Sequence, residues 1–172
     1  MARHTDAYLF GNSKVDVIGS NDARWTPYAL KHNTACEICP GCKIRIVDAP
    51  YFLALKIDAF EKRGKGDYRF SKDMEDIICL IDGREALLAE IVATNDAELV
   101  SYVSEHLGSM GDNITEAIQA HIGTGQGERA RIPLALERFH KMQNSKIKRA
   151  PATLTAPQGR TEWRHGQSTS HA

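Results

Sequence analysis

Two consecutive amphipathic helices within residues 49–84 constrain the fold more than any other feature of this chain. The first is predicted over residues 50–63, because Pro50 suits the first turn of a helix and Gly64 follows its end. Asp48, directly upstream, is a candidate N-cap. The apolar side chains recur at the helical period and form a stripe that faces the core: Leu53, Ile57 and Phe60.

The second helix is predicted to begin after Ser71, a typical N-cap residue. Its buried stripe comprises Met74, Ile77, Ile78 and Ile81. Lys56 and Arg63 share a further face of the first helix, and that face is cationic. Asp73 and Asp76 are neighbours on the second helix. The helix dipole favours carboxylates near an N-terminus, so a solvated helix face explains them without any function.

The charged residues also follow a longer pattern: K-x-D-A-F-x-x-R from Lys56, S-x-D-x-E-D-I from Ser71, and D-G-R from Asp82. This pattern resembles the downstream signature of nucleotidyltransferase-fold proteins of the abortive-infection AbiEii type, a type IV toxin family. The likeness covers residues 14–139 and is strongest over residues 49–84. Its length makes the match more specific than a short motif.

The resemblance implies a sheet whose carboxylates hold Mg²⁺ and a nucleoside triphosphate, followed by a helix whose lysine binds the phosphates. Lys56 is the expected phosphate-binding lysine. Asp16, on a predicted strand over residues 14–18, matches the third carboxylate and is expected to bind Mg²⁺ or act as the base. The remaining residues expected to orient Lys56 or contact the nucleotide are Asp58, Arg63, Asp73 and Asp76.

The Gly-Ser turn and Asp-x-Asp strand that open these enzymes are missing before Asp16. Two-metal phosphoryl transfer needs several carboxylates, because the two ions must be held about 3.5–4 Å apart. We expect a fragment truncated at its start site, a degenerate member that lost catalysis, or one half of a site completed elsewhere. The resemblance further implies a toxin with a separate antitoxin protein, and RNA such as tRNA, or a protein hydroxyl, as the acceptor.

The patterning predicts one α/β (α+β) domain over residues 1–144, with a small nucleotidyltransferase-like sheet in residues 1–48 and a helical region in residues 49–144. The alternating strands 14–18 and 43–47 are expected to pair in one sheet. Further helices are predicted over residues 84–92, 96–107 (with Asn95 as N-cap), 112–122 and 131–142. Trp25 is expected to pack in the core rather than stack on a base.

Residues 145–172 lose the apolar periodicity and are expected to form a disordered tail. Lys plus Arg equal Asp plus Glu at 22 each, so no overall basic field indicates nucleic acid. No run of about 18–20 apolar residues and no secretory signal is present, which favours a cytoplasmic protein without a membrane partner.

Three cysteines form a C-x-x-C-x-x-C pattern, a spacing typical of metal sites: Cys36, Cys39 and Cys42. Structural Zn²⁺ takes four ligands, and His32 is the nearest candidate for the fourth. The alternative is an ordinary Pro40–Gly41 turn between two strands. Three hypotheses therefore remain open: a nucleotidyltransferase, a catalytically inactive nucleotide- or partner-binding module of the same fold, and a zinc-stabilised RNA-binding protein.

Overall fold

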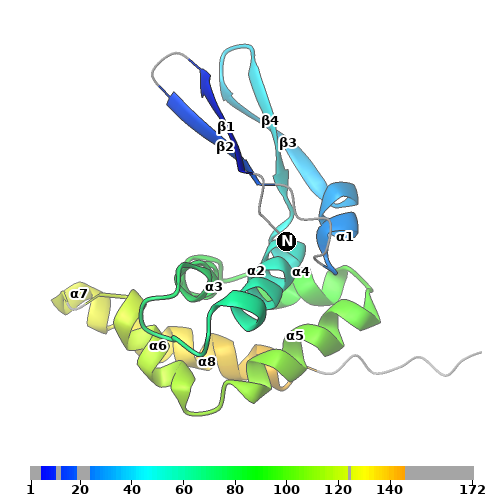
Figure 1. Ribbon diagram of the computed structural model, residues 1–172. Coiled ribbons are helices and arrows are strands. Elements are labelled where there is room, and N and C mark those ends of the chain that lie inside the picture. Colours follow the sequence, from blue (N-terminus) through cyan, green and yellow to red (C-terminus); the bar gives the residue numbers. More distant parts are fainter. Residues whose placement is uncertain (1–4, 11–12, 19–23, 124, 146–172) are drawn as a thin grey trace, which may run out of the picture.

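Two β-hairpins lie outside a body of packed helices (Figure 1). The computed structural model describes residues 5–10, 13–18, 24–123 and 125–145. The strands are β1 (Thr5–Phe10), β2 (Ser13–Ile18), β3 (Asn33–Cys39) and β4 (Cys42–Val47). The predicted α+β class, with strands first and a helical C-terminal region, is confirmed.

The hairpins are separate two-stranded antiparallel sheets, so the predicted pairing of strands 14–18 and 43–47 in one sheet is wrong. β1 pairs with β2, and β3 pairs with β4. Two residues separate the strands of each pair in the sequence, and a short connection closes at a lower entropic cost than a long one. Local pairing therefore prevails, and it uses β1 and β3, which the sequence analysis did not predict.

Helix α1 (Thr26–Lys31) connects the hairpins to the body through Trp25. The Trp25 side chain is fully buried, and its ring lies 5.0 Å from that of Tyr102 and 5.2 Å from that of Tyr28 between centroids. The prediction that Trp25 packs in the core is confirmed. The tryptophan directly before this six-residue helix thus packs the start of α1 against α5.

Helices α2 (Ala49–Arg63) and α3 (Lys72–Gly83) confirm the two amphipathic helices predicted from the sequence. Pro50 lies in the first turn of α2, and the Ser71 side chain accepts a hydrogen bond from the Met74 N–H at 3.4 Å. The expectation that the Asp48 side chain caps α2 is wrong. Its carboxylate accepts instead from the Thr34 hydroxyl at 2.9 Å and so joins β3 to the start of α2.

The remaining helices are α4 (Leu87–Ala93), α5 (Ala97–Ser109), α6 (Asn113–His121), α7 (Gln126–Arg129) and α8 (Ile132–Gln143). The N-cap of α5 is Asp96, whose carboxylate accepts from the Glu98 and Leu99 N–H groups at 3.1 Å each. The predicted cap, Asn95, instead adopts a positive φ of 52°. The cap prediction was therefore one residue early.

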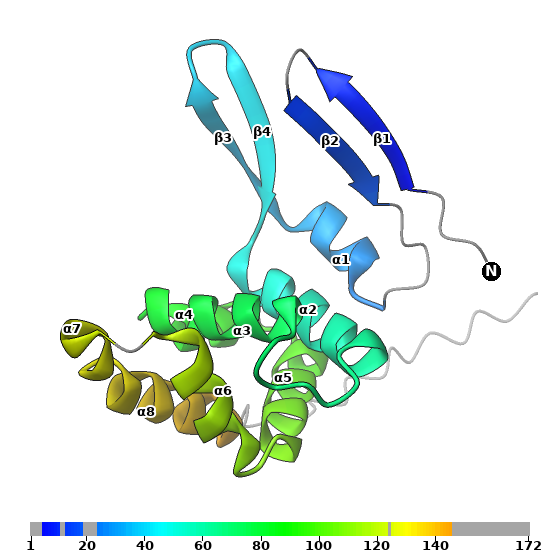
Figure 2. The same cartoon turned by 60° about the vertical axis from the view of Figure 1, so that its left-hand side comes forward.

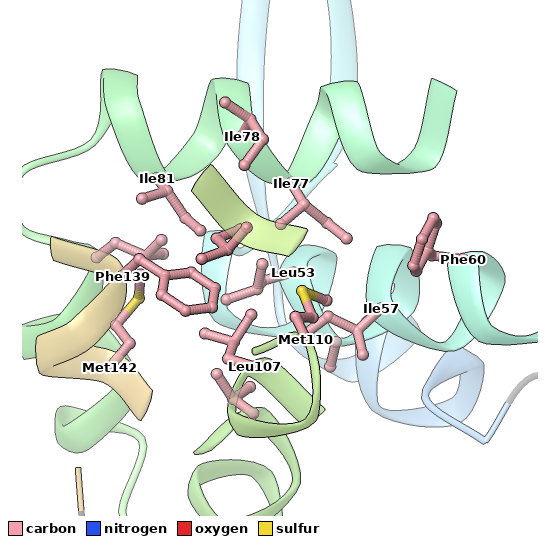
Figure 3. Close-up of a cluster of buried hydrophobic side chains, with 14 of the residues drawn as sticks. Leu53, Ile57, Phe60, Ile77, Ile78, Ile81, Leu107, Met110, Phe139 and Met142 are labelled. Carbon is pink, nitrogen blue, oxygen red and sulfur yellow. The ribbon is translucent and has the colours of Figure 1, made fainter. Parts of the chain in front are cut away.

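The apolar core lies among the helices, and the β3–β4 hairpin lies outside it. Figure 3 shows the side chains that converge there from α2, α3, α5 and α8, among them Leu53, Ile77, Leu107 and Phe139. No described side chain of β3 or β4 is fully buried, and Val47 only packs against the edge of the core. The stability of the described chain therefore resides in the helical body.

The predicted disordered tail, residues 145–172, lies outside the described residues except for Ser145. The boundary predicted between a strand part and a helical part falls at the start of α2. Within the described part of the chain, no helix has both the length and the hydropathy that crossing a bilayer requires.

Candidate functional site

The predicted phosphate-binding lysine lies in an ion-pair cluster between α2 and α3. The Lys56 ammonium is 2.5 Å from an Asp76 carboxylate oxygen and 3.6 Å from an Asp73 oxygen. The Lys56 side chain is 23% exposed, so its ammonium remains in contact with the surface. The Lys56 Nζ also lies 5.4 Å from the centroid of the Phe52 ring, a cation–π contact. The structure thus orients Lys56 through residues of both predicted helices.

Arg63 is held more completely than Lys56. Its guanidinium donates two hydrogen bonds to Asp73, from Nε at 2.6 Å and from Nη2 at 2.7 Å. This bidentate geometry is the strongest that arginine forms with a carboxylate. The hydrogen bonds from Arg63 hold the pKa of Asp73 below its ordinary value, and they raise the pKa of Arg63 in turn. Asp73 is therefore an ionised, almost buried anchor that serves both cations.

Two of the six predicted nucleotide-site residues lie apart from this cluster. Asp58 forms an ion pair with Lys62, one turn further along α2, at 2.8 Å. Asp16 lies in β2, opposite Ala7, and its side chain falls outside the described residues. Figures 1 and 2 both show the β1–β2 hairpin standing outside the helical body that contains α2. The structure therefore brings together Lys56, Arg63, Asp73 and Asp76, but it does not bring Asp16 to them.

Asp82, the last acidic residue of the signature, has a structural partner. Its side chain forms an ion pair with Arg131 at the start of α8. Arg138 of α8 donates to the Asp82 and Ile81 carbonyl oxygens at the end of α3. These contacts satisfy the carboxyl end of a helix with cations, as the helix dipole favours. The D-G-R segment thus joins α3 to α8.

The three clustered cysteines lie at the free end of the β3–β4 hairpin. Cys39 and Cys42 flank the Pro40–Gly41 turn, are exposed, and are opposite each other in the register. Gly41 has a φ of 78°, a conformation that favours glycine, so the predicted turn is confirmed. Cys36 lies nearer the base of the hairpin, opposite Ile44, and is partly buried.

His32 is remote from the cysteines at the tip. It follows α1 at the base of the hairpin, and its ring stacks on that of Tyr51 with centroids 4.3 Å apart. Cys39 lies six residues after Asn33 along β3, a distance of about 20 Å at the rise of a strand. The structure therefore does not place His32 as the fourth zinc ligand.

Among the residues that the structure describes, no group of three or more His, Cys, Asp or Glu side chains is placed to hold a metal ion. The described side chains therefore do not complete either the predicted Mg²⁺ site or the predicted one-chain Zn²⁺ site. The α2–α3 cluster offers Mg²⁺ only carboxylates that are already bound to Lys56 and Arg63.

The sequence analysis missed an apolar cavity of about 690 Å³ between α4 and α8. Its lining includes the half-exposed side chains of Val92 and Leu134 and the basic side chains of Arg138 and Lys141. Val92 and Leu134 belong to helices far apart in the sequence, so helical periodicity alone gave no signal for this cavity.

Comparisons of the chain with protein-family models, with curated protein sequences and with solved structures give no match.

Proposed function

We propose that this protein is nucleotidyltransferase-like and that the α2–α3 cluster is the phosphate-binding part of its site. The observation that carries the proposal is the state of Lys56. Asp73 and Asp76 hold its ammonium at the surface, whereas both ends of the Arg63 fork are occupied by Asp73. An oriented, partly exposed ammonium is the form in which lysine binds phosphate as a point charge.

In the proposed complex, the phosphates of a magnesium-bound nucleoside triphosphate replace Asp76 as the closest partner of Lys56. Asp76 suits this exchange because its side chain is 42% exposed and water can take over its hydrogen bonds. Asp73 remains in place and keeps the lysine stem oriented, because its side chain is only 5% exposed and Arg63 holds it. Arg63 is a positioning residue in this proposal.

The reaction implied by the resemblance is attack of an acceptor hydroxyl on the α-phosphorus, with pyrophosphate as the leaving group. The hydroxyl oxygen forms the new P–O bond, the bond to the β-phosphate breaks, and the hydroxyl proton passes to a base. Asp16 is the candidate base in this chain, and it has to approach Lys56 for transfer to occur. Positive charge from Lys56 stabilises the phosphates as charge develops on the leaving group.

The acceptor proposed from the resemblance is an RNA hydroxyl, in tRNA for example, or a protein hydroxyl. The proposed setting is the cytoplasm, where nucleoside triphosphates and RNA are both present. A cognate antitoxin protein is the proposed partner that restrains the activity.

A second candidate function is nucleotide binding without turnover, in a catalytically inactive module of the same fold. One specific observation favours it. Asp16 lies in a separate hairpin from Lys56, and the described residues contain no set of three metal-ligating side chains. Both candidates require Lys56 to bind phosphate, and they differ only in nucleotidyl transfer.

The test is incubation of the full chain with each α-³²P-labelled nucleoside triphosphate, Mg²⁺ and total tRNA, followed by electrophoresis. The enzyme proposal expects a labelled RNA band that Lys56→Ala abolishes and Lys72→Ala retains. Lys72 is the matched control, because it lies on α3 and pairs with Glu75 on the surface. Filter binding of the labelled nucleotide is measured in parallel.

Nucleotide binding that depends on Lys56, without a labelled acceptor, supports the inactive module and contradicts the enzyme. Equal nucleotide binding by the wild type and Lys56→Ala contradicts both candidates. Circular dichroism of each variant establishes that a lost signal reflects the missing ammonium rather than unfolding. Lys56→Arg keeps the charge and is expected to recover part of the binding.

A further inference from the structure

We propose that Cys39 and Cys42 form half of a zinc site at the tip of the β3–β4 hairpin, and that a second copy of this chain completes it. Two thiolates from each copy surround one Zn²⁺ ion and join two chains tip to tip. The proposal is independent of the α2–α3 cluster and of any nucleotidyl transfer.

The register makes Cys39 and Cys42 a chelating pair. They are direct cross-strand partners beside a two-residue turn, so their side chains leave the same face of the hairpin. Opposed residues in an antiparallel pair have Cβ atoms about 4.5–5.5 Å apart. Two thiolates on one zinc ion lie within about 4.6 Å of each other, because each Zn–S bond is about 2.3 Å. Small rotations of the side chains therefore suffice to bind one ion.

A register irregularity between Glu37 and Cys39 brings the third cysteine to the same face. Ile38 is the extra residue, so Cys36 pairs with Ile44 while Cys39 pairs with Cys42. Ile44 and Cys42 are two apart on β4 and thus share a face, which their partners Cys36 and Cys39 also share. Cys36 is a diagonal neighbour of Cys42 across the two strands, and such neighbours lie about 7–8 Å apart. This separation is too long for Cys36 to bind the same ion as Cys39 and Cys42.

Within the described part of the chain, Cys39 and Cys42 have no further metal ligand beside them. The described residues contain no third ligand close enough to form a metal site with Cys39 and Cys42, and His32 lies at the opposite end of the hairpin. Structural zinc nevertheless takes four ligands in a tetrahedron. A two-fold axis through the ion supplies two more thiolates from the same residues of a second chain.

The tip is accessible for such an approach. Figures 1 and 2 show the β3–β4 hairpin projecting from the helical body, with its turn at the far end. Cys39, Pro40, Gly41 and Cys42 are all exposed. The nearest charged residues, Glu37 and Lys43, are cross-strand partners of opposite sign on the other face. The Glu37 carboxylate also accepts from the Gly41 N–H at 2.9 Å, so no uncompensated charge repels a second tip.

Zinc binding at this site involves no oxidation or reduction. Four thiols, two from each chain, lose their protons and form four Zn–S bonds, which releases four protons for each ion bound.

The test uses the full chain, purified without a metal-affinity tag in a non-chelating reductant. The proposal expects about one zinc for every two chains by elemental analysis, and the mass of a dimer by light scattering. A chelator is expected to return the protein to monomers, and added Zn²⁺ to restore the dimer. Co²⁺ in place of Zn²⁺ is expected to give the thiolate charge-transfer band of a four-sulfur site.

Cys39→Ser and Cys42→Ser are each expected to abolish both the zinc and the dimer. Cys36→Ser and Cys79→Ser, the matched controls, are expected to retain both, since Cys79 is an exposed cysteine on α3. One zinc in each monomeric chain would overturn the proposal, as would loss of zinc in Cys36→Ser. A reduced wild-type protein that stays monomeric and metal-free in added Zn²⁺ would also overturn the proposal. So would a wild-type protein in which Cys39 and Cys42 form only a disulfide with each other.

Discussion

Asp73 is the residue on which the α2–α3 contact depends most. It is almost buried, it accepts two hydrogen bonds from Arg63, and it forms an ion pair with Lys56. A buried carboxylate is stable only when such partners compensate for its lost hydration. Asp76, one turn later, is half-exposed and contacts Lys56 at the surface. The two acidic residues that look equivalent in sequence thus differ in both burial and partners.

Asp73→Asn is expected to lower the free energy of unfolding at pH 7 by about 2 kcal/mol, the usual value of hydrogen bonds to a charged group. The loss is moderated because Arg63 is about half exposed and water replaces part of the contact. Urea denaturation measures it. Glu75→Gln, which removes a surface ion pair on the same helix, is the control and is expected to change stability little.

The same residue gives an expected pH dependence. The folded-state pKa of Asp73 lies below its unfolded-state value, about 3.9, so the unfolded chain takes up this proton first on acidification. The stabilisation from Asp73 is therefore complete well above pH 4 and is lost as the pH falls towards the folded-state pKa. Denaturation at a series of pH values should show a shallower acid decline in Asp73→Asn than in the wild type. Parallel curves would contradict this assignment.

At the residue scale, the sequence predicted the faces of the helices but not their partners. Helical periodicity placed Lys56 and Arg63 on one face of α2, and it made Asp73 and Asp76 neighbours on α3. Which cation meets which carboxylate depends on how two helices cross, and that geometry comes from side chains packed across the whole core. Asp58 shows that closeness in sequence does not identify the partner. It lies two residues after Lys56 but forms its ion pair with Lys62.

At the element scale, the strongest local signals gave the right helices. As predicted, Pro50 lies in the first turn of α2, Gly64 follows its last residue, and Ser71 caps α3. The strand pairing was wrong because apolar alternation identifies a strand without identifying its partner. In the structure, each strand pairs with its neighbour in the sequence, because only two residues connect the strands of each hairpin.

Trp25, the residue directly before α1, is the largest buried side chain where this helix attaches to the body. Trp25→Ala is expected to lower the free energy of unfolding by about 3–5 kcal/mol, because it leaves a cavity between the rings of Tyr28, Tyr51 and Tyr102. Leu30→Ala on the same helix is the control. Its side chain is 75% exposed, so we expect a change within about 0.5 kcal/mol. Equal losses in the two variants by urea denaturation would contradict the packing described for Trp25.

At the scale of the whole molecule, the cysteine pair and the apolar core lie in separate parts of the fold. The described core side chains come from Trp25, Ala29 and the helices after residue 49, whereas β3 and β4 contribute no fully buried side chain. The α2–α3 ion pairs lie on the body, and the cysteine pair lies at the end of a projecting hairpin. Substitutions at the hairpin tip should therefore test binding without disturbing folding.

Replacing residues 35–45 by a short Gly-Ser connector is expected to leave the unfolding midpoint of the helical body within a few degrees of the wild type, since none of the replaced residues is fully buried. Thermal unfolding followed by far-ultraviolet circular dichroism measures this. Thr34 and Asp48 are retained in this variant, so their hydrogen bond between β3 and α2 is kept. A large loss of the midpoint would mean that the hairpin stabilises the body.

The extra residue Ile38 has a consequence for how this hairpin can vary in length. Because Ile38 has no partner on β4, its deletion would leave Cys36 opposite Ile44 and Cys39 opposite Cys42. Chains with one or two residues between the first two cysteines would therefore present the same face. The spacing of Cys39 and Cys42 has no such freedom, because the two-residue turn between them sets both the register and the turn type. Among descendants of this sequence, we expect insertions and deletions to accumulate before the turn and to be absent within it.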